Sequence, residues 1–149
     1  MSNVTYVARD NASSSSIDFL GYVQPDLSAI ESRLKSEITS EVQQVYALSG
    51  HTLNAGGKRL RPAMVSLSAR CIQPDLSEKD LEIVGAAVEL VHMATLVHDD
   101  VVDDTATRRG KPTANAVFGN GVAVLSGDFL LARAMRLLCD YGEIEIIRT

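Results

Sequence analysis

Hydrophobic residues recur along most of the chain at steps of three and four, the spacing of one face of an α-helix. The first such stripe begins after Asp26 and predicts one long amphipathic helix that ends near Ser49-Gly50. Its apolar members are Leu27, Ile30, Leu34, Ile38, Val42, Val45 and Leu48. A loop that contains Asn54, Gly56 and Gly57 follows this helix.

The next two helices have recognisable start signals. Pro62 suits the first turn of a helix, where its missing N–H needs no partner, and this helix is predicted to end before Pro74. Ser77 and Asp80 resemble a capping box that begins a further helix near Glu78. The buried face of that helix is predicted to contain Ile83, Ala87, Leu90, Ala94, Val97 and Val101.

The last third of the chain continues the helical pattern. Residues 108–112 are predicted to form a loop, and a short segment to Phe118 precedes a break at residues 119–121. A strongly apolar helix is expected from roughly residue 122 to Tyr141, where Gly142 interrupts it. Because no segment alternates with the two-residue period of a strand, the pattern predicts an all-α fold.

Composition narrows the class of protein. A chain of 149 residues with 46% hydrophobic residues is long enough to bury a core. A net charge of −5 argues against a general nucleic-acid or anionic-membrane partner. Cys71 and Cys139 lie in apolar helical patterns without CxxC spacing, which predicts reduced core residues in a cytoplasmic protein.

Targeting and membrane signals are expected to be absent. No uninterrupted apolar run of about 18 residues predicts a transmembrane helix. The first residues lack the apolar core of a secretory signal. Residues 1–25, with the serine run 13–16, are predicted to form a flexible tail before one domain over residues 26–149.

An acidic cluster ends the helix that begins near Glu78. With roughly 100° per residue, Asp99 and Asp103 lie on successive turns of one stripe, and Asp100 lies at its edge. Two carboxylates one turn apart suit Mg²⁺, which proteins usually hold through one or two carboxylates plus substrate phosphates. A solvated acidic helix end is the alternative, but Arg108 and Arg109 follow closely and are suited to phosphate oxygens.

The pair His98-Asp99 raises the alternative of a metal-dependent phosphohydrolase, which would use further His and Asp ligands. The remaining histidines are His51 and His92. His98 points roughly 100° away from Asp99 on a helix, and His92 lies some 10 Å along the axis, so these groups do not converge on one metal.

A glycine-rich basic stretch, AGGKRLRP, covers residues 55–62. Its cations Lys58, Arg59 and Arg61 stand at the start of a helix, whose free N–H groups and dipole favour anions. The stretch therefore predicts a diphosphate pocket, although it lacks the spacing of a Walker A loop. A solvated basic loop is the alternative.

Four ordered motifs together resemble the trans-isoprenyl diphosphate synthases. They are GGKRLRP at residues 56–62, ELVH at 89–92, DDVVD at 99–103 and RRG at 108–110, and Gly127-Asp128 is also similar. The resemblance covers roughly residues 27–149 and is greatest to long-chain heptaprenyl, octaprenyl and solanesyl diphosphate synthases. It implies an isoprenoid-synthase-type helical bundle around a central cavity, of which this chain is the N-terminal half.

The resemblance also implies an activity, the Mg²⁺-dependent condensation of isopentenyl diphosphate with an allylic diphosphate. Residues are carried over by motif. Asp99 and Asp103 would bind the metal, with Asp100 as a further candidate; Arg108 would contact the allylic diphosphate; Lys58, Arg61, His92 and Arg109 would bind isopentenyl diphosphate. No protein base is implied, because in the family the released diphosphate is thought to accept the proton.

Product length is expected to depend on the turn before the first aspartate motif, where the family uses aromatic side chains to block the growing chain. Ala94 and Thr95 occupy these positions and are small, so the resemblance favours a long product. The alternative is that Ala94 only packs in the helix and that another residue stops the chain.

The family's second aspartate-rich motif is not found in these 149 residues. The chain alone is therefore expected to be inactive or nearly so, and the resemblance implies a homodimer. A second hypothesis is a non-catalytic subunit or fragment that associates with a partner synthase.

Overall fold

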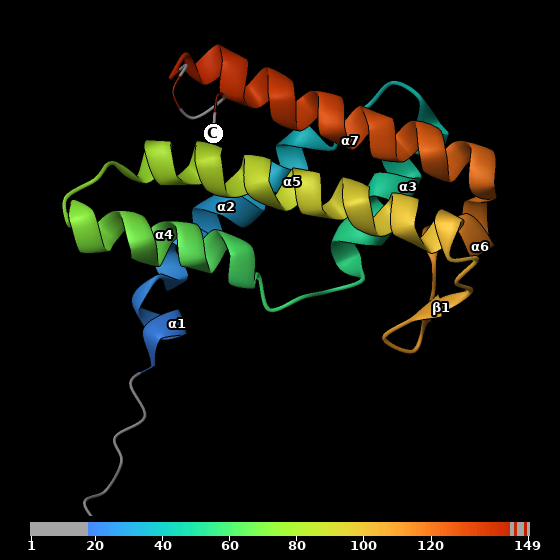
Figure 1. The fold of residues 1–149 in the computed structure, drawn as a ribbon, viewed down its shortest axis with the longest axis horizontal. Helices are drawn as coiled ribbons and strands as arrows, with labels where there is room; N and C mark the ends of the chain where they lie inside the picture. Colours follow the sequence, from blue (N-terminus) through green and yellow to red (C-terminus); the bar gives the residue numbers. More distant parts are fainter. Residues whose placement is uncertain (1–17, 144, 146–147, 149) are drawn as a thin grey trace, which may run out of the picture.

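The computed structural model describes residues 18–143, 145 and 148, and this part of the chain is mostly helical (Figure 1). The elements are α1 (Phe19–Tyr22), α2 (Gln24–Glu37), α3 (Gln43–Asn54), α4 (Leu60–Ile72), α5 (Glu78–Val102), β1 (Thr107–Arg108), β2 (Lys111–Pro112), α6 (Ala114–Phe118) and α7 (Asn120–Tyr141). The predicted all-α class is confirmed.

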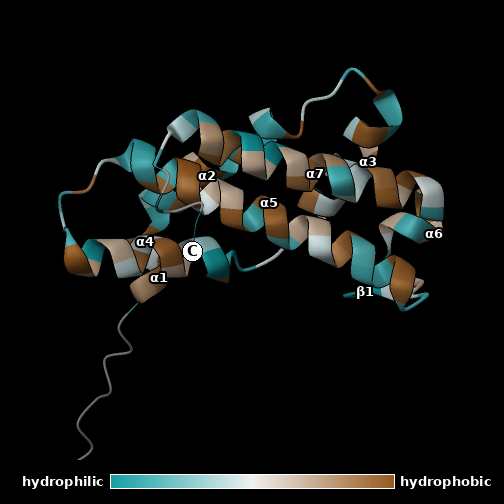
Figure 2. Ribbon diagram, turned by 45° about the horizontal axis from the view of Figure 1, so that its top comes forward, coloured by the Kyte–Doolittle hydropathy of each residue, from teal (hydrophilic) through white to brown (hydrophobic). Residues whose placement is uncertain are grey.

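Helix α5 is the centre of the fold. It runs beside α7 along most of its length, while α2 and α4 pack against it (Figure 1). The main core lies among α2, α4, α5 and α7, and Ile30, Leu34, Leu90 and Leu130 are buried in it. A second cluster joins α3, α5, α6 and α7 around Leu48 and Val97. Hydrophobic and hydrophilic positions are interspersed along each long helix, as expected of amphipathic helices (Figure 2).

The first predicted helix is wrong in extent, because it is two helices. Helix α2 ends at Glu37 and α3 begins at Gln43. Between them the hydroxyl of Ser40 accepts a hydrogen bond from the backbone N–H of Val42 at 3.2 Å, a local bond that competes with helix formation. Val42 is 57% exposed, so its place in the apolar stripe did not reflect burial. Helix α3 also continues past Ser49-Gly50 to Asn54.

The predicted later helices agree with the structure. The hydroxyl of Ser77 accepts a hydrogen bond from the backbone N–H of Asp80 and donates to its carboxylate, which caps α5. The predicted buried face of α5 is buried from Ile83 to Val97, and Val101 is partly buried. Helices α4 and α7 match the predicted ranges within two residues.

Residues 108–112 do not form a simple loop, contrary to the prediction. Two short antiparallel strands pair Thr107 with Pro112 and Arg108 with Lys111. The turn residues Arg109 and Gly110 both have positive φ, of 53° and 76°, as two-residue hairpins require. The hairpin was missed because each strand is only two residues long.

The prediction that both cysteines are core residues is wrong. Cys71 and Cys139 are free, but they are exposed on α4 and α7. These faces also expose large hydrophobic side chains such as Met64 and Met135, so apolar spacing alone did not distinguish buried positions from exposed ones.

The structure begins before the predicted domain boundary at residue 25. Asp18 caps α1 by accepting a hydrogen bond from the backbone N–H of Gly21, and Val23 is fully buried in the core. Residues 1–17 of the predicted tail, with the serine run 13–16, lie outside the described residues. The division into tail and domain stays a prediction.

Within the described residues, α5 is the one helix whose length and composition would allow it to cross a membrane. More than half of its most apolar window, 56%, is buried against the rest of the protein. Core helices of soluble proteins share this length and composition, so these two properties alone do not indicate a membrane span. The predicted lack of a transmembrane segment stays a prediction.

Candidate functional site

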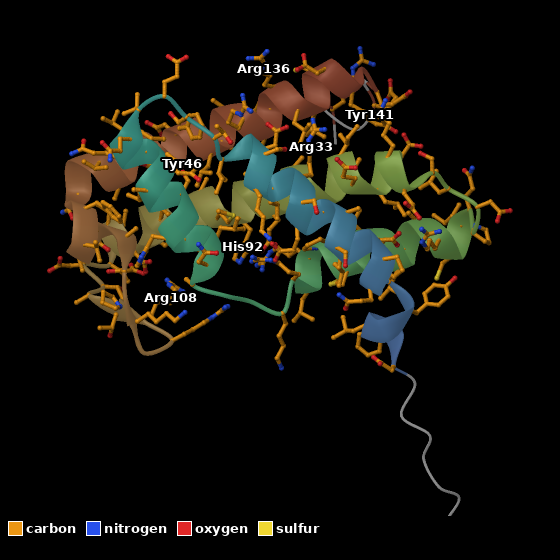
Figure 3. The ribbon with its side chains drawn as sticks, turned by 180° about the vertical axis from the view of Figure 1, so that it is seen from behind. Arg33, Tyr46, His92, Arg108, Arg136 and Tyr141 are labelled. Carbon is orange, nitrogen blue, oxygen red and sulfur yellow. The ribbon has the colours of Figure 1, made fainter. Side chains whose placement is uncertain are left out.

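A cavity of about 590 Å³ opens between the end of α3, the start of α4, the middle of α5 and the hairpin. Five of the predicted diphosphate-binding side chains line it, and they come from three separate segments of the chain: Lys58, Arg61, His92, Arg108 and Arg109. Figure 3 shows His92 on α5 and Arg108 on the hairpin, two of the residues that line this cavity. The structure therefore brings together cations that are up to 51 residues apart in the sequence.

His92 is held as a neutral hydrogen-bond acceptor. Its Nε2 lies 3.1 Å from Nη1 of Arg61, and because a guanidinium can only donate, Nε2 accepts this bond. Burial lowers the pKa of His92, and the charges of Arg61, Arg109 and Arg108 lower it further, while Glu89 opposes them. The pKa of His92 therefore depends on the cations that line the cavity.

The lowered pKa of His92 should make the stability of the protein depend on pH. The pKa of His92 is lower in the folded protein than in the unfolded chain, so the unfolded state binds more protons as the pH falls through the ordinary histidine range. Stability is then lost below about pH 6.5. We expect His92→Gln, which keeps an acceptor for Arg61 but does not titrate, to lose less stability than the wild type between about pH 7.5 and about pH 5.5. Urea denaturation at both pH values measures this difference, and equal losses would contradict it.

The hairpin is docked onto the glycine-rich stretch and the end of α3. Arg109 donates a hydrogen bond to the backbone carbonyl of Gly56, and Nζ of Lys111 donates to that of Asn54 at 3.3 Å. The ring of His51 bonds the carbonyl of Pro112 at 3.0 Å. A Cβ at position 57 would lie 3.3 Å from Nη1 of Arg109, so the absence of a side chain at Gly57 makes room for this approach.

Asp100 forms an ion pair with Arg108. Its carboxylate is buried and accepts hydrogen bonds from Nε and Nη2 of Arg108 at 3.0 and 2.8 Å. These bonds raise the pKa of Arg108 against the effect of burial, and the negative charges of Asp99 and Asp103 contribute as well. The arginine is therefore oriented by one aspartate and lies in the field of the other two.

Asp99 and Asp103 are exposed and do not line the cavity. They lie on successive turns, because the backbone N–H of Asp103 donates to the carbonyl of Asp99 at 2.8 Å at the end of α5. Among the described residues no group of three or more His, Cys, Asp or Glu side chains could hold a metal ion. Two exposed carboxylates beside an arginine still suit Mg²⁺, whose remaining ligands are usually water and substrate phosphates.

The two predicted chain-length residues have different environments. Ala94 is 2% exposed and belongs to the main core, as the packing alternative expects. Thr95 is exposed one turn before Asp99, and its hydroxyl donates to the carbonyl of His92 at 2.8 Å. The role of either residue in product length stays a prediction.

Two further features were not anticipated. Arg59, which the sequence placed among the cations for an anion, instead forms ion pairs with the partly exposed Glu31 and the buried Glu89. In the predicted Gly127-Asp128 motif, Gly127 lies so close to the His98 ring that a Cβ would collide with it. No periodicity in the sequence indicates either contact, since each joins residues at least 28 positions apart.

The described part of the chain is an all-α helical bundle with a pocket lined by arginine and lysine side chains, and two exposed carboxylates lie at the end of the helix that forms one wall of this pocket. A family model described as polyprenyl synthetase matches residues 42–149, and the chain belongs to this family.

Individual relatives agree with this assignment. The chain is similar to the all-trans-nonaprenyl-diphosphate synthase (geranyl-diphosphate specific) of Rhodobacter capsulatus, with 45% identity over 88% of this chain and 40% of the relative. It is 43% identical to heptaprenyl diphosphate synthase component 2 of Geobacillus stearothermophilus, over 82% of this chain and 38% of that one.

The structure resembles the polyprenyl synthase of Caulobacter crescentus CB15 complexed with calcium and isoprenyl diphosphate, with a TM-score of 0.83 and 37% identity over 87% of this chain and 39% of that one. The isoprenoid-synthase fold expected from the motifs is thereby confirmed. The chain spans about 40% of the length of these relatives.

Proposed function

We propose that this chain is the N-terminal part of a trans-prenyl diphosphate synthase that condenses isopentenyl diphosphate with an allylic diphosphate to give a long-chain polyprenyl diphosphate. The observation that supports it most is the convergence of Lys58, Arg61, His92 and Arg109 on one cavity that Arg108 also lines. The names of the relatives, which specify nonaprenyl and heptaprenyl products, support a long product.

Within this proposal the cavity binds isopentenyl diphosphate. Lys58, Arg61 and Arg109 bring three positive charges to its diphosphate, and guanidinium groups form paired hydrogen bonds to phosphate oxygens. His92 lies against Arg61 and orients that guanidinium. Because the pocket holds the diphosphate end of isopentenyl diphosphate, the double bond at the other end can be directed at the allylic substrate.

The allylic diphosphate is assigned to Arg108 and the exposed pair Asp99 and Asp103. The two carboxylates would hold Mg²⁺, which stabilises the negative charge that develops on the diphosphate when the allylic C–O bond ionises. Arg108, held in place by Asp100, donates hydrogen bonds to the same leaving group. Apolar walls from Met93, Leu96 and Val97 exclude water from the carbocation.

The assembly and location of the protein are also proposals. The resemblance favours a homodimer, and two free cysteines without CxxC spacing favour the cytoplasm. A second candidate, a subunit that works with a different partner chain, is favoured by one observation: a similar relative is named component 2 of a heptaprenyl diphosphate synthase.

A product assay on the protein expressed from its complete reading frame tests both candidates. Purified protein with Mg²⁺, isopentenyl diphosphate and farnesyl diphosphate should form a long polyprenyl diphosphate, resolved by chromatography after dephosphorylation. Turnover that needs no other chain supports the self-sufficient enzyme. Turnover that occurs only after a second subunit is added supports the alternative. No turnover in either case would overturn the proposed function.

A further inference from the structure

Arg59 lies in the glycine-rich basic stretch, but its guanidinium faces into the protein. Its side chain is only 13% exposed. Nε donates to Glu31 of α2 at 2.8 Å, Nη1 donates to Glu89 of α5 at 3.0 Å, and Nη2 donates to the backbone carbonyl of Leu53 in α3 at 3.1 Å. One side chain thus connects the start of α4 to three other helices.

The backbone at Arg59 is also unusual. Its φ of 48° and ψ of 41° lie in the left-handed region, which favours glycine, and the residue directly precedes α4. Arg59 lines the cavity together with Lys58 and Arg61, but only Lys58 and Arg61 are exposed. The three guanidinium bonds therefore hold the backbone of a segment whose other two cations are free to bind a ligand.

Glu89 gives Arg59 a second effect. Its side chain is 6% exposed, and the residue lines the same cavity as Lys58, Arg61 and His92. Without Arg59 the carboxylate of Glu89 would be left buried and unpaired beside a site for an anion. A buried charge without its partner is strongly unfavourable, and a negative one also repels a diphosphate.

We propose that Arg59 is a positioning residue for isopentenyl diphosphate. It fixes the backbone that carries Lys58 and Arg61, and it neutralises Glu89 within the diphosphate pocket. This inference rests on the proposed prenyl-transfer function, because that function assigns the pocket to isopentenyl diphosphate.

Isothermal titration of the complete protein with isopentenyl diphosphate alone measures the effect without turnover. We expect Arg59→Met to bind isopentenyl diphosphate about tenfold more weakly, since it removes three charge-assisted hydrogen bonds. Binding of farnesyl diphosphate with Mg²⁺ should stay within about twofold, because the ligands proposed for it lie on α5 and the hairpin. A merely structural loss would weaken both substrates alike.

A second substitution separates the two effects of Arg59. In Arg59→Met combined with Glu89→Gln, no unpaired charge remains in the pocket, so we expect the affinity for isopentenyl diphosphate to rise at least about threefold above that of Arg59→Met.

Two further variants serve as comparisons. Arg59→Gly suits the left-handed backbone but has no guanidinium, and it should bind isopentenyl diphosphate as weakly as Arg59→Met. Arg33→Met is a matched control, because Arg33 pairs with Glu37 and Glu82 and does not line the cavity. Both affinities should be unchanged in it.

Three results distinguish the outcomes. If the wild-type protein neither binds nor uses isopentenyl diphosphate, the proposed function fails. The role of Arg59 is overturned if the wild type binds isopentenyl diphosphate and folded Arg59→Met binds it equally well. It is also overturned if Arg59→Met loses affinity for both substrates equally and Glu89→Gln restores none of it. Should Arg59→Met not fold, Glu31→Gln loosens Arg59 without stranding a buried charge; about threefold weaker binding of isopentenyl diphosphate supports the role, and unchanged binding overturns it.

Discussion

Replacement of Asp99 or Asp103 by Asn is expected to lower the turnover of the complete enzyme by about a thousandfold or more, with little change in its stability. Both side chains are exposed, so the substitutions leave the core intact. They remove the carboxylates proposed to hold Mg²⁺. Without the metal, its positive charge no longer stabilises the departing diphosphate. Steady-state assays across a range of Mg²⁺ concentrations measure the effect, and the concentration required for half-maximal rate should rise.

Asp104 offers a matched control for this prediction. It belongs to the same acidic run and is exposed, but it is not part of the paired stripe. Its φ of 48° is one that Asn tolerates well, so Asp104→Asn changes charge without backbone strain. This variant should keep near wild-type turnover. Similar losses in Asp104→Asn and Asp99→Asn would mean that net charge, and not metal ligation, is responsible.

An aromatic side chain at residue 95 is expected to shorten the product by several isoprene units. Thr95 is exposed one turn before Asp99, on the stripe that carries the proposed metal ligands. A growing chain that extends along this stripe from the allylic diphosphate would meet Phe at position 95. Chromatography of the dephosphorylated products of Thr95→Phe measures the change, and an unchanged length distribution would remove Thr95 from the path of the chain.

Ala94→Phe should act differently. Ala94 is buried in the main core, so a ring at this position overpacks it and costs about 1–3 kcal/mol of stability. Chemical denaturation of the two variants side by side separates lost stability from altered product length. A stable Ala94→Phe enzyme with shortened products would instead place Ala94 beside the growing chain, as the resemblance implies.

The long helices could be predicted because their signals are local. Each signal involves residues that are close together in the sequence. Examples are the capping pair Ser77 and Asp80, the apolar stripe from Ile83 to Val97 and the terminal Gly142. The break between α2 and α3 was missed because Ile38 and Val42 continue the apolar spacing through it. The spacing does not reveal that Ser40 bonds the backbone there, or that Val42 is exposed.

The sequence by itself determined the all-α class, the family and the order of the basic and acidic motifs, because these depend on residue type and on spacing along one chain. Only the tertiary structure decided how the charges are used. Arg59 is paired with Glu31 and Glu89, while its neighbours Lys58 and Arg61 are exposed in the same cavity, and Asp100 binds Arg108. Adjacent residues of the same charge look alike in a sequence. Their partners lie on other helices, and packing of those helices sets which oppositely charged groups come within hydrogen-bond distance.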